Sequence, residues 1–326
     1  MDVLIVEPID SDVLQWLGAR HAVRYAPEVA ADAGALRDAL AAARAVIIPP
    51  AVPLDAAALR AAARLRIVGR LSVGAENIDL DACSRAGIEV SRPASAGAVA
   101  EAEFVVGALL QMLRRVPIIS DEGLLVGREL GGSIVGVVGM TPALKPLTTL
   151  LVAFGARPLG YDPGVHASDA LWQRAGVEPV GLRELMRASD AVAVMLPYYP
   201  RYAGLFGERL LAEAKANQVI VNLSHSTLFD ETALAAALTQ GPLAAAWFDS
   251  LEPGALDAGR PLRHVDTLQV TPRVAGTTRE SRVRSAWAVA RRIDEVLAAE
   301  PAPSHENFRT TFPGVLADLG GGRAPA

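Results

Sequence analysis

Cysteine is almost absent from this sequence, with one thiol, Cys83, among 326 residues. A single cysteine excludes a disulfide framework within the chain and any metal site built from several thiolates. No H-x-x-x-H pair, EF-hand loop or carboxylate-rich spacing takes their place, so we expect no protein-bound metal. Cys83 is expected to pack as a small buried hydrophobic residue.

An excess of charge of either sign is also missing. The chain has 31 Lys and Arg residues against 36 Asp and Glu residues, interspersed along its length, and its formal net charge is −5. This balance offers no electrostatic footprint for nucleic acid or for an anionic membrane. We therefore expect neither as a partner.

Signals for export or membrane insertion are lacking as well. The first letters, MDVLIVEP, contain no basic region and no long apolar core, so they do not predict a signal peptide. The most apolar stretch, residues 104–119, is interrupted by Arg114 and Arg115 and is too short to span a bilayer. The expectation is a soluble, cytoplasmic protein.

What the sequence does contain is a regular alternation of apolar runs and helical stretches. Hydrophobic residues make up 51% of the chain and charged residues 21%, which allows a large core, and the length favours two domains. Strand-like runs at 2–8, 45–50 and 66–72 alternate with amphipathic segments, and after a predicted helix at 98–115 the alternation restarts at 133–139. This pattern predicts parallel sheets with helices on both faces. Two such units with a cleft between them are a usual setting for a small-molecule site.

Seven segments follow one another in order from about residue 65 to 285. They read RLSVGAENIDLDACSRAGIEV, AVAEAEFVVGALLQMLRR, GVVG with FGARPLGYDP, LPYYP, VNLSHSTLFDETALAAAL, DSLEP and PLRHVDTLQVTPRVAGTTRES. In that order they resemble the substrate-carboxylate loop, interdomain helix, cofactor turn, second cofactor loop, and arginine, glutamate and histidine segments of the D-isomer-specific 2-hydroxyacid dehydrogenases. The ordered set is specific to this family, although no single segment is.

The resemblance implies an α/β fold with two doubly wound parallel-sheet domains. A Rossmann-like cofactor domain, residues 98–285, would be inserted into a flavodoxin-like substrate domain formed by residues 1–97 and 286–326. The resemblance also implies a nicotinamide cofactor, a small-molecule carboxylate substrate and a homodimer that pairs through the cofactor domains around the interdomain helix.

The cofactor turn departs from the family pattern G-x-x-G-x-G-x-x-G. Gly136 and Gly139 match it, but Thr141 and Leu144 occupy the last two glycine positions. Those glycines let the backbone approach the pyrophosphate and let the helix pack on the strand. A threonine hydroxyl still offers a phosphate a hydrogen bond, whereas Leu144 adds bulk, and Pro146 predicts a helix that begins late. The turn is either a modified dinucleotide site or the remnant of one.

Asp162 ends the second strand of the cofactor unit, about 20 residues beyond the turn. A carboxylate there accepts a hydrogen bond from the ribose 2′-OH and disfavours a 2′-phosphate, which favours NAD over NADP. The letters YDPG would also suit an ordinary turn, and both interpretations stay open. The resemblance adds Pro197 and Asp249 to Gly139, Thr141 and Asp162 as cofactor-binding residues, with Asp249 near the nicotinamide carboxamide.

Hydride transfer to a 2-oxo acid needs a cation that clamps the substrate, an acid–base group and a carboxylate beside it. The family supplies arginine, histidine and glutamate, and the matching positions here hold His225, Arg273 and Glu252. The arginine and the histidine have exchanged places, and the segment from Asp249 to Glu252 is shorter than in the family. We assign His225 as acid–base group, Arg273 as clamp and Glu252 as the carboxylate. No G-x-S-x-G motif supports a serine hydrolase.

The loop LSVGAEN offers the backbone N–H groups of Val73 and Gly74 to a substrate carboxylate, as in the family. Tyr198 and Tyr199 either pack locally or stack on a ligand. Two functions remain open from the sequence. One is an NAD-dependent oxidoreductase that transfers hydride between nicotinamide and a small 2-oxo or 2-hydroxy acid. The alternative is a non-catalytic relative, a pseudoenzyme that binds a ligand or a partner.

Overall fold

The computed structural model describes residues 1–72, 74–115 and 118–299. These residues form two compact units: an N-terminal unit of residues 1–97 and 277–299, and a central unit of residues 98–276. The first division falls at 97/98. The second falls before the expected position 285/286, because the last helix, α11 (Arg279–Ala298), packs on the N-terminal sheet from its first turns onward.

The N-terminal unit contains a five-stranded parallel sheet in the order β2-β1-β3-β4-β5. This is the flavodoxin-like order, which the resemblance predicted. The strands are β1 Val3–Ile5, β2 Val23–Tyr25, β3 Ala45–Ile47, β4 Ile67–Gly69 and β5 Glu89–Ser91. The helices of this unit are α1 Ser11–Gly18, α2 Ala33–Ala41, α3 Ala56–Ala61, α4 Leu80–Arg85 and α11.

Local sequence explains why these elements form. Strand residues alternate between two buried layers: one set packs under α2, α3 and α4, and the other under α1 and α11. An aspartate caps the start of each of the first four helices by accepting backbone N–H groups of the first turn. Those aspartates are Asp10, Asp32, Asp55 and Asp79.

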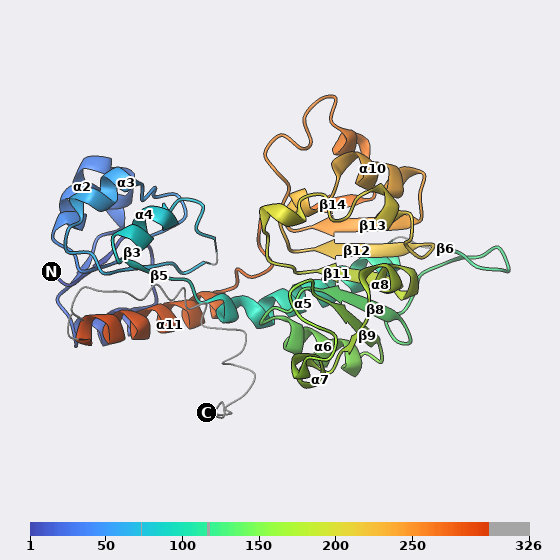
Figure 1. Ribbon diagram of the computed structural model, residues 1–326, viewed down its shortest axis with the longest axis horizontal. Coiled ribbons are helices and arrows are strands. Elements are labelled where there is room, and N and C mark those ends of the chain that lie inside the picture. Colours follow the sequence, from blue (N-terminus) through green and yellow to red (C-terminus); the bar gives the residue numbers. More distant parts are fainter. Residues whose placement is uncertain (73, 116–117, 300–326) are drawn as a thin grey trace. The chain divides into compact units, whose positions relative to one another are not determined.

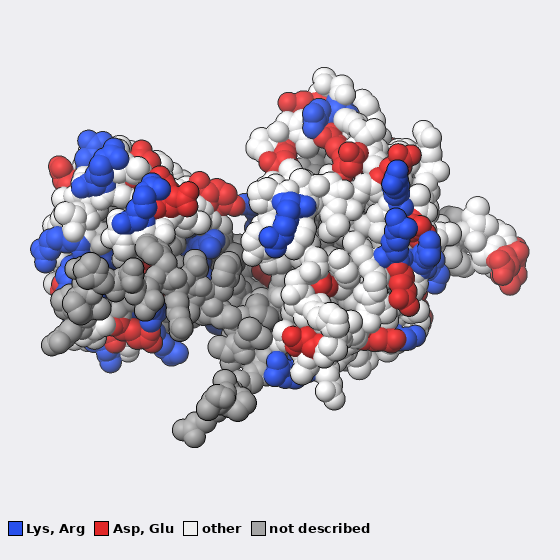
Figure 2. All heavy atoms as spheres, viewed as in Figure 1, with Lys and Arg blue, Asp and Glu red and all other residues white. Residues whose placement is uncertain are grey.

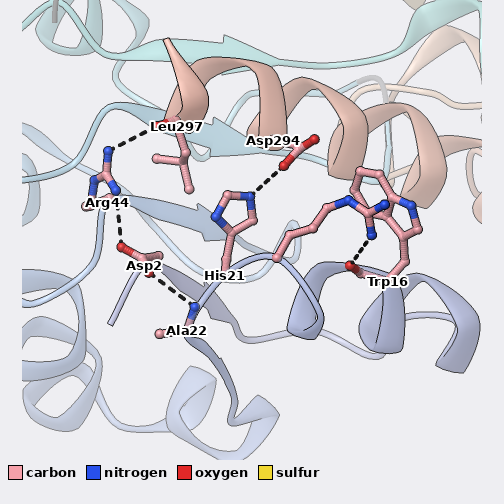
Figure 3. A network of polar contacts seen from close by, with 8 residues as sticks. Asp2, Trp16, His21, Ala22, Arg44, Asp294 and Leu297 are labelled. Atoms are coloured by element: carbon pink, nitrogen blue, oxygen red, sulfur yellow. Dashed lines mark hydrogen bonds and ion pairs between the residues drawn. The ribbon is translucent and has the colours of Figure 1, made fainter. Parts of the chain in front are cut away.

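A polar network fastens the end of α11 to the amino edge of this sheet, as Figure 3 shows. His21 Nε2 lies 2.8 Å from a carboxylate oxygen of Asp294. Arg44 reaches Asp2 at 3.2 Å and donates to the carbonyl oxygen of Leu297, also at 3.2 Å. These contacts join residues from opposite ends of the chain, so they hold the last helix in the N-terminal unit.

The central unit contains a seven-stranded parallel sheet in the order β10-β9-β8-β11-β12-β13-β14, which is a Rossmann order extended by one strand. The strands are β8 Ile134–Val138, β9 Arg157–Tyr161, β10 Glu178–Pro179, β11 Ala191–Val194, β12 Gln218–Asn222, β13 Leu243–Phe248 and β14 Leu268–Val270. The helices are α5 Ala98–Arg115, α6 Leu144–Ala153, α7 Ala170–Ala175, α8 Leu182–Ala188, α9 Glu208–Leu211 and α10 Glu231–Thr239. The first three cover one face of the sheet and the last three the other (Figure 1). The predicted doubly wound fold is confirmed.

Helix α5 is both long and apolar. By length and composition alone, the helical stretch Ala94–Arg115 could cross a membrane, but 61% of its most apolar window is buried inside the protein. Val105, Leu109 and Met112 are fully buried among sheet residues. The stretch therefore packs as a core helix. On the visible face, acidic and basic side chains are interspersed (Figure 2).

A short antiparallel hairpin, β6 Ile118–Ile119 with β7 Leu125–Val126, follows α5, and the sequence pattern did not predict it. In Figure 1 it projects from the central unit. Ile119 is 74% exposed, Leu124 61% and Leu125 71%. A two-stranded hairpin with exposed apolar side chains is marginally stable in water.

Candidate active site

The carboxyl ends of parallel strands lie at one edge of the sheet, where ligands bind in open α/β folds. In the central unit this edge collects six of the predicted site residues, each just beyond a different strand. They are Gly139, Asp162, Pro197, His225, Asp249 and Arg273, after β8, β9, β11, β12, β13 and β14. Gly74 belongs to the N-terminal unit, and Val73 lies outside the described residues.

Gly139 sits where β8 passes directly against β11. Its φ is +118°, and a Cβ atom added here would lie 2.7 Å from Leu196 N and 2.8 Å from Leu196 Cα. Both obstacles are backbone atoms, which cannot rotate away. The position therefore requires glycine, both for its conformation and for the close approach.

The rest of the turn corrects one expectation. The predicted start of the helix at Pro146 is wrong, because α6 begins at Leu144 after a turn in which Leu144 N donates to Thr141 O at 3.0 Å. Pro146 falls in the first helical turn, where a backbone N–H has no intrahelical partner, so its ring costs little. Leu144 is 1% exposed and contributes to the core shared with α5.

Thr141 carries an unpaired donor at this turn. Its Oγ1 atom is buried and has no hydrogen-bond partner among the described residues. A buried hydroxyl without a partner costs roughly 1–3 kcal/mol, and a phosphate oxygen would satisfy it. The residues present at the turn therefore fit a dinucleotide: a bare glycine backbone and one free hydroxyl donor.

Asp162 stabilises the turn through its carboxylate and can still accept a hydrogen bond from a ribose hydroxyl. One carboxylate oxygen accepts from Met140 N at 2.7 Å, and the other accepts from Gly164 N at 2.7 Å. The first bond fixes the turn to the end of β9. Each oxygen retains a lone pair, so the carboxylate can still accept a hydroxyl.

His225 and Glu252 come together at the ends of neighbouring strands. Glu252 Oε1 lies 3.1 Å from His225 Nε2, and the two side chains are 46% and 26% exposed. On the other side of the ring, Nδ1 lies 2.7 Å from Thr227 Oγ1. Tyr198 stacks on the imidazole with ring centroids 4.4 Å apart and an angle of 24° between the planes. A histidine held by a carboxylate is the arrangement used for general acid–base chemistry.

The loop after β12 builds most of this arrangement itself. The buried side chain of Asn222 bonds both to the backbone N–H and to the carbonyl oxygen of Ser224, which bends the chain just before His225. Ser226 Oγ then accepts from Glu252 N at 3.1 Å, and this bond draws the loop after β13 toward the histidine. The short segment from Asp249 to Glu252 thus brings the Glu252 side chain to His225, which follows the adjacent strand β12.

Arg273 flanks the same β13 loop at Ser250. Its Nε lies 3.4 Å from Ser250 Oγ, and its backbone N–H donates to Asp249 O. Its φ of +55° is unusual for a residue with a side chain, and such strain costs about 1–2 kcal/mol and tends to occur at functional sites. The structure places Arg273 beside the loop that carries Glu252.

Asp249 braces the loop that carries Arg273. Its carboxylate accepts from Thr271 Oγ1 at 2.7 Å and from the backbone N–H groups of Val274 and Ala275 at 2.9 Å each. The residue is 7% exposed. Its predicted contact with the nicotinamide carboxamide stays a prediction, whereas the brace is what the geometry shows.

Sequence reasoning missed Glu101, which lies on α5 against the same loop. A Cβ atom at Gly276 would be 3.0 Å from Glu101 Oε1. Burial, reinforced by the negative charge of Asp249, raises the pKa of Glu101 to about 7. Nothing in the sequence distinguishes this glutamate from the exposed ones on the same helix, because its pKa depends on what the fold packs around it.

Replacing Glu101 with glutamine should therefore stabilise the protein at high pH only. Between about pH 4.5 and 7 the folded state keeps a proton that the unfolded chain has lost, so wild-type stability declines as pH rises through this window. The variant lacks this decline, and we expect its free energy of unfolding to exceed that of the wild type by about 3 kcal/mol at pH 8 and to match it near pH 4.5. Urea unfolding at both pH values measures the difference. A shift of equal size at both would contradict the assignment.

The expected carboxylate loop in the N-terminal unit rests on a buried cation. Arg70 is 1% exposed and donates to Gly74 O at 3.1 Å, Ile48 O at 3.1 Å and Ser72 Oγ at 2.8 Å. Glu7, 4% exposed, lies near it, and burial raises the pKa of Glu7. The buried guanidinium of Arg70 holds the loop in place through its hydrogen bonds to Ser72 and Gly74. The sequence pattern did not predict these hydrogen bonds.

No group of three or more His, Cys, Asp and Glu side chains is arranged to hold a metal ion within residues 1–72, 74–115 and 118–299. What the fold and this edge define is a two-unit α/β protein with a Rossmann-like nucleotide-binding unit. Its acidic residue on the second strand and its histidine–glutamate pair are typical of dehydrogenases.

Comparison with known proteins narrows this class. The model of the D-isomer specific 2-hydroxyacid dehydrogenase NAD binding domain matches residues 108–275. The chain is 33% identical over 316 residues to D-3-phosphoglycerate dehydrogenase of Mycobacterium tuberculosis, covering 94% of this chain and 58% of that protein. It is 32% identical over 295 residues to (S)-sulfolactate dehydrogenase of Chromohalobacter salexigens, covering 88% and 95%.

The fold is shared with a solved structure, D-lactate dehydrogenase from Aquifex aeolicus complexed with NAD and lactic acid. The TM-score is 0.70 at 21% identity, covering 91% of this chain and 95% of that one. The chain belongs to the D-isomer specific 2-hydroxyacid dehydrogenase family, and its central unit corresponds to the NAD binding domain of that family. It spans 58% of the length of the mycobacterial phosphoglycerate relatives.

Proposed function

We propose that this protein is an NAD-dependent oxidoreductase that transfers hydride between nicotinamide and a small 2-oxo or 2-hydroxy acid. The observation that carries the proposal is the His225–Glu252 pair, 3.1 Å apart at the carboxyl edge of the cofactor sheet. His225 is the acid–base group, Glu252 orients it, and Arg273 clamps the substrate. The N–H groups of Val73 and Gly74 bind the substrate carboxylate. The relatives named above are called after 2-hydroxy acids, which supports this substrate class.

The exchanged catalytic set has a physical basis in this proposal. Glu252 can reach only what its short loop allows, and that loop is tied to Ser226, next to His225. A histidine after β12 therefore lies next to the residue that holds the Glu252 loop, Ser226. A histidine after β14 would lack this hydrogen bond between neighbouring loops. Arginine after β14 keeps a cation beside the same loop.

The cofactor is assigned to Gly139, Thr141, Asp162, Pro197 and Asp249. Gly139 and Thr141 face the diphosphate and Asp162 accepts a ribose hydroxyl, which favours NAD over NADP because a 2′-phosphate would meet the carboxylate. Bound nicotinamide supplies the acceptor or donor of hydride; binding, orientation and proton transfer fall to the chain's own residues.

Direct titration tests this proposal. We expect NADH to bind with micromolar affinity and NADPH about tenfold more weakly, a difference of about 1.4 kcal/mol. Calorimetry measures both, and a panel of 2-oxo acids then identifies an accepted substrate by NADH consumption. Absence of NADH binding at millimolar concentration would refute the dehydrogenase assignment.

The alternative is a non-catalytic relative that binds a ligand or a partner. Thr141 and Leu144 in place of two glycines favour this alternative, since they alter the phosphate turn. The two functions differ in one result: the alternative predicts no oxidation of NADH with any 2-oxo acid of the panel, whether or not the dinucleotide binds.

The functional form is proposed to be a cytoplasmic homodimer. The exposed apolar side chains of the β6–β7 hairpin, Ile119, Leu124 and Leu125, support association, since contiguous apolar surface marks interaction sites. Sedimentation velocity decides this, and a monomer throughout the micromolar range would contradict it.

A further inference from the structure

We propose that Thr227 passes the proton between His225 and the substrate oxygen. The inference rests on the proposed function and adds a third residue to the catalytic pair. It follows from one feature of the site: neither ring nitrogen of His225 is open to a substrate.

The two ring contacts define the tautomer of the histidine. A carboxylate only accepts hydrogen bonds, so the neutral tautomer that suits Glu252 Oε1, 3.1 Å away, is the one with its hydrogen on Nε2, and we infer this tautomer. In a neutral imidazole the other nitrogen is then an acceptor. Nδ1 therefore accepts the hydrogen of the Thr227 hydroxyl, 2.7 Å away. In this tautomer Nδ1 is the nitrogen that can take up a proton, and the hydroxyl of Thr227 is hydrogen-bonded to it.

Thr227 is held where it is by backbone contacts. It belongs to a short 3-10 turn, Ser226–Leu228, that starts at His225. Its carbonyl oxygen accepts from Gly204 N at 2.9 Å, and the next carbonyl, of Leu228, accepts from Phe206 N at 2.9 Å. These two backbone hydrogen bonds hold the turn in place. A substrate hydroxyl could therefore reach Nδ1 of His225 only if the Thr227 side chain rotated and broke its own hydrogen bond to Nδ1.

The ring is fixed as well, which closes the other routes. Tyr198 covers one face of the imidazole at 4.4 Å, and Glu252 is itself held by Ser226. Rotating the imidazole out of the site would break its hydrogen bond to Thr227, its ion-pair contact with Glu252 and its stacking on Tyr198. The remaining path for a proton runs through the Thr227 hydroxyl, which both donates and accepts.

The step balances as follows in the direction of oxidation. The substrate hydroxyl gives its proton to Thr227 Oγ1 while the hydroxyl proton of Thr227 moves to Nδ1 of His225. Nicotinamide, when bound, would accept the electron pair of the substrate C–H bond as hydride, and the carbon–oxygen bond would become double. The substrate loses two electrons and two hydrogens, Thr227 regains a hydroxyl, and His225 becomes an imidazolium that pairs with Glu252.

Thr227→Val tests the relay, since valine keeps the shape and removes the hydroxyl. We expect kcat to fall about 100-fold, in the range of general acid–base contributions, and Thr227→Ser to restore it to within about fivefold of wild type. Thr239→Val is the matched control: it removes a hydroxyl that bonds to Ala235 O at 2.8 Å at the end of α10, and it should leave kcat unchanged. A loss in Thr227→Val that serine does not restore overturns the relay.

A second measurement uses the protein without cofactor. In wild type, the ¹⁵N resonances of His225 should show a protonated Nε2 and an unprotonated, hydrogen-bonded Nδ1. Thr227→Val should move the Nδ1 resonance toward that of a free acceptor and leave Nε2 in place. A protonated Nδ1 in the wild-type spectrum at neutral pH overturns the relay regardless of any effect on turnover.

The outcomes separate the relay from the function that it presupposes. If His225→Asn removes turnover and Thr227→Val does not, the relay is wrong and the proposed function stands. If neither variant changes a measurable turnover, the assignment of His225 fails with the relay. If Thr227→Val does not fold, the serine variant and the ¹⁵N spectrum of wild type still decide the matter.

Discussion

Replacing His225 with asparagine is expected to lower kcat for an accepted 2-oxo acid about 1,000-fold, because the site loses the residue assigned as its acid–base group. Asparagine keeps a polar side chain near Glu252 and Thr227, so the loops around it should hold. NADH affinity should change by less than about threefold, since the histidine contributes to the transition state rather than to cofactor binding. Stopped-flow NADH oxidation and calorimetry measure the two quantities.

His264→Asn is the matched control for this prediction. His264 lies in the same unit, in the short 3-10 turn Pro261–His264, and is exposed. Its replacement should leave kcat and NADH binding at wild-type values. A His225 variant with wild-type kcat would contradict the exchanged catalytic set, and the arginine after β14 would then lose its proposed role as well.

Replacing Gly139 with alanine is expected to remove NADH binding and to lower the free energy of unfolding by about 2–5 kcal/mol. The estimate adds a left-handed strain of about 1–2 kcal/mol to an overpacking cost of about 1–3 kcal/mol. The added methyl group would lie 2.7–2.8 Å from backbone atoms of Leu196 and Met195. Relief requires β8 and β11 to separate at the edge where the turn begins.

Gly132→Ala isolates the strain from the clash. Gly132 also has a positive φ, +78°, but nothing lies within 4 Å of an added Cβ. This variant should lose only about 1–2 kcal/mol and should bind NADH normally. Urea unfolding of both variants gives the comparison, and equal losses would show that the contact between β8 and β11 is unimportant.

Much of the fold follows from local sequence. Runs such as IVGVV at 134–138 and VIV at 219–221 are apolar along their whole length, which suits strands buried on both faces of a parallel sheet. Their alternation with helices predicted two doubly wound units, and both strand orders agree. The hairpin β6–β7 escaped prediction because two-residue strands carry no periodicity. The start of α6 was misplaced because Pro146 was taken to interrupt a helix in whose first turn it lies.

The candidate site likewise has residues that the sequence could name and contacts that only the structure shows. Gly139, Asp162, His225, Asp249 and Arg273 could be named from the sequence because the segments that carry them resemble those of the family, and the parallel strands before them end at one edge. The contact between His225 and Glu252 could not be derived, since it depends on a hydrogen bond from one loop to Ser226 in the next. Thr227 and Glu101 gave no usable signal, and the sequence left Tyr198 open between local packing and stacking on a ligand.

The sequence by itself determined the strands, the helices and the kinds of side chain available at the carboxyl edge, because backbone preference and hydrophobic periodicity act over a few neighbouring residues. Only the tertiary structure decided which nitrogen of His225 meets Glu252, which hydroxyl covers the other, and why the pKa of Glu101 is raised. Hydrogen-bond geometry and burial depend on groups from strands and loops far apart in the chain, which come together only when the chain folds.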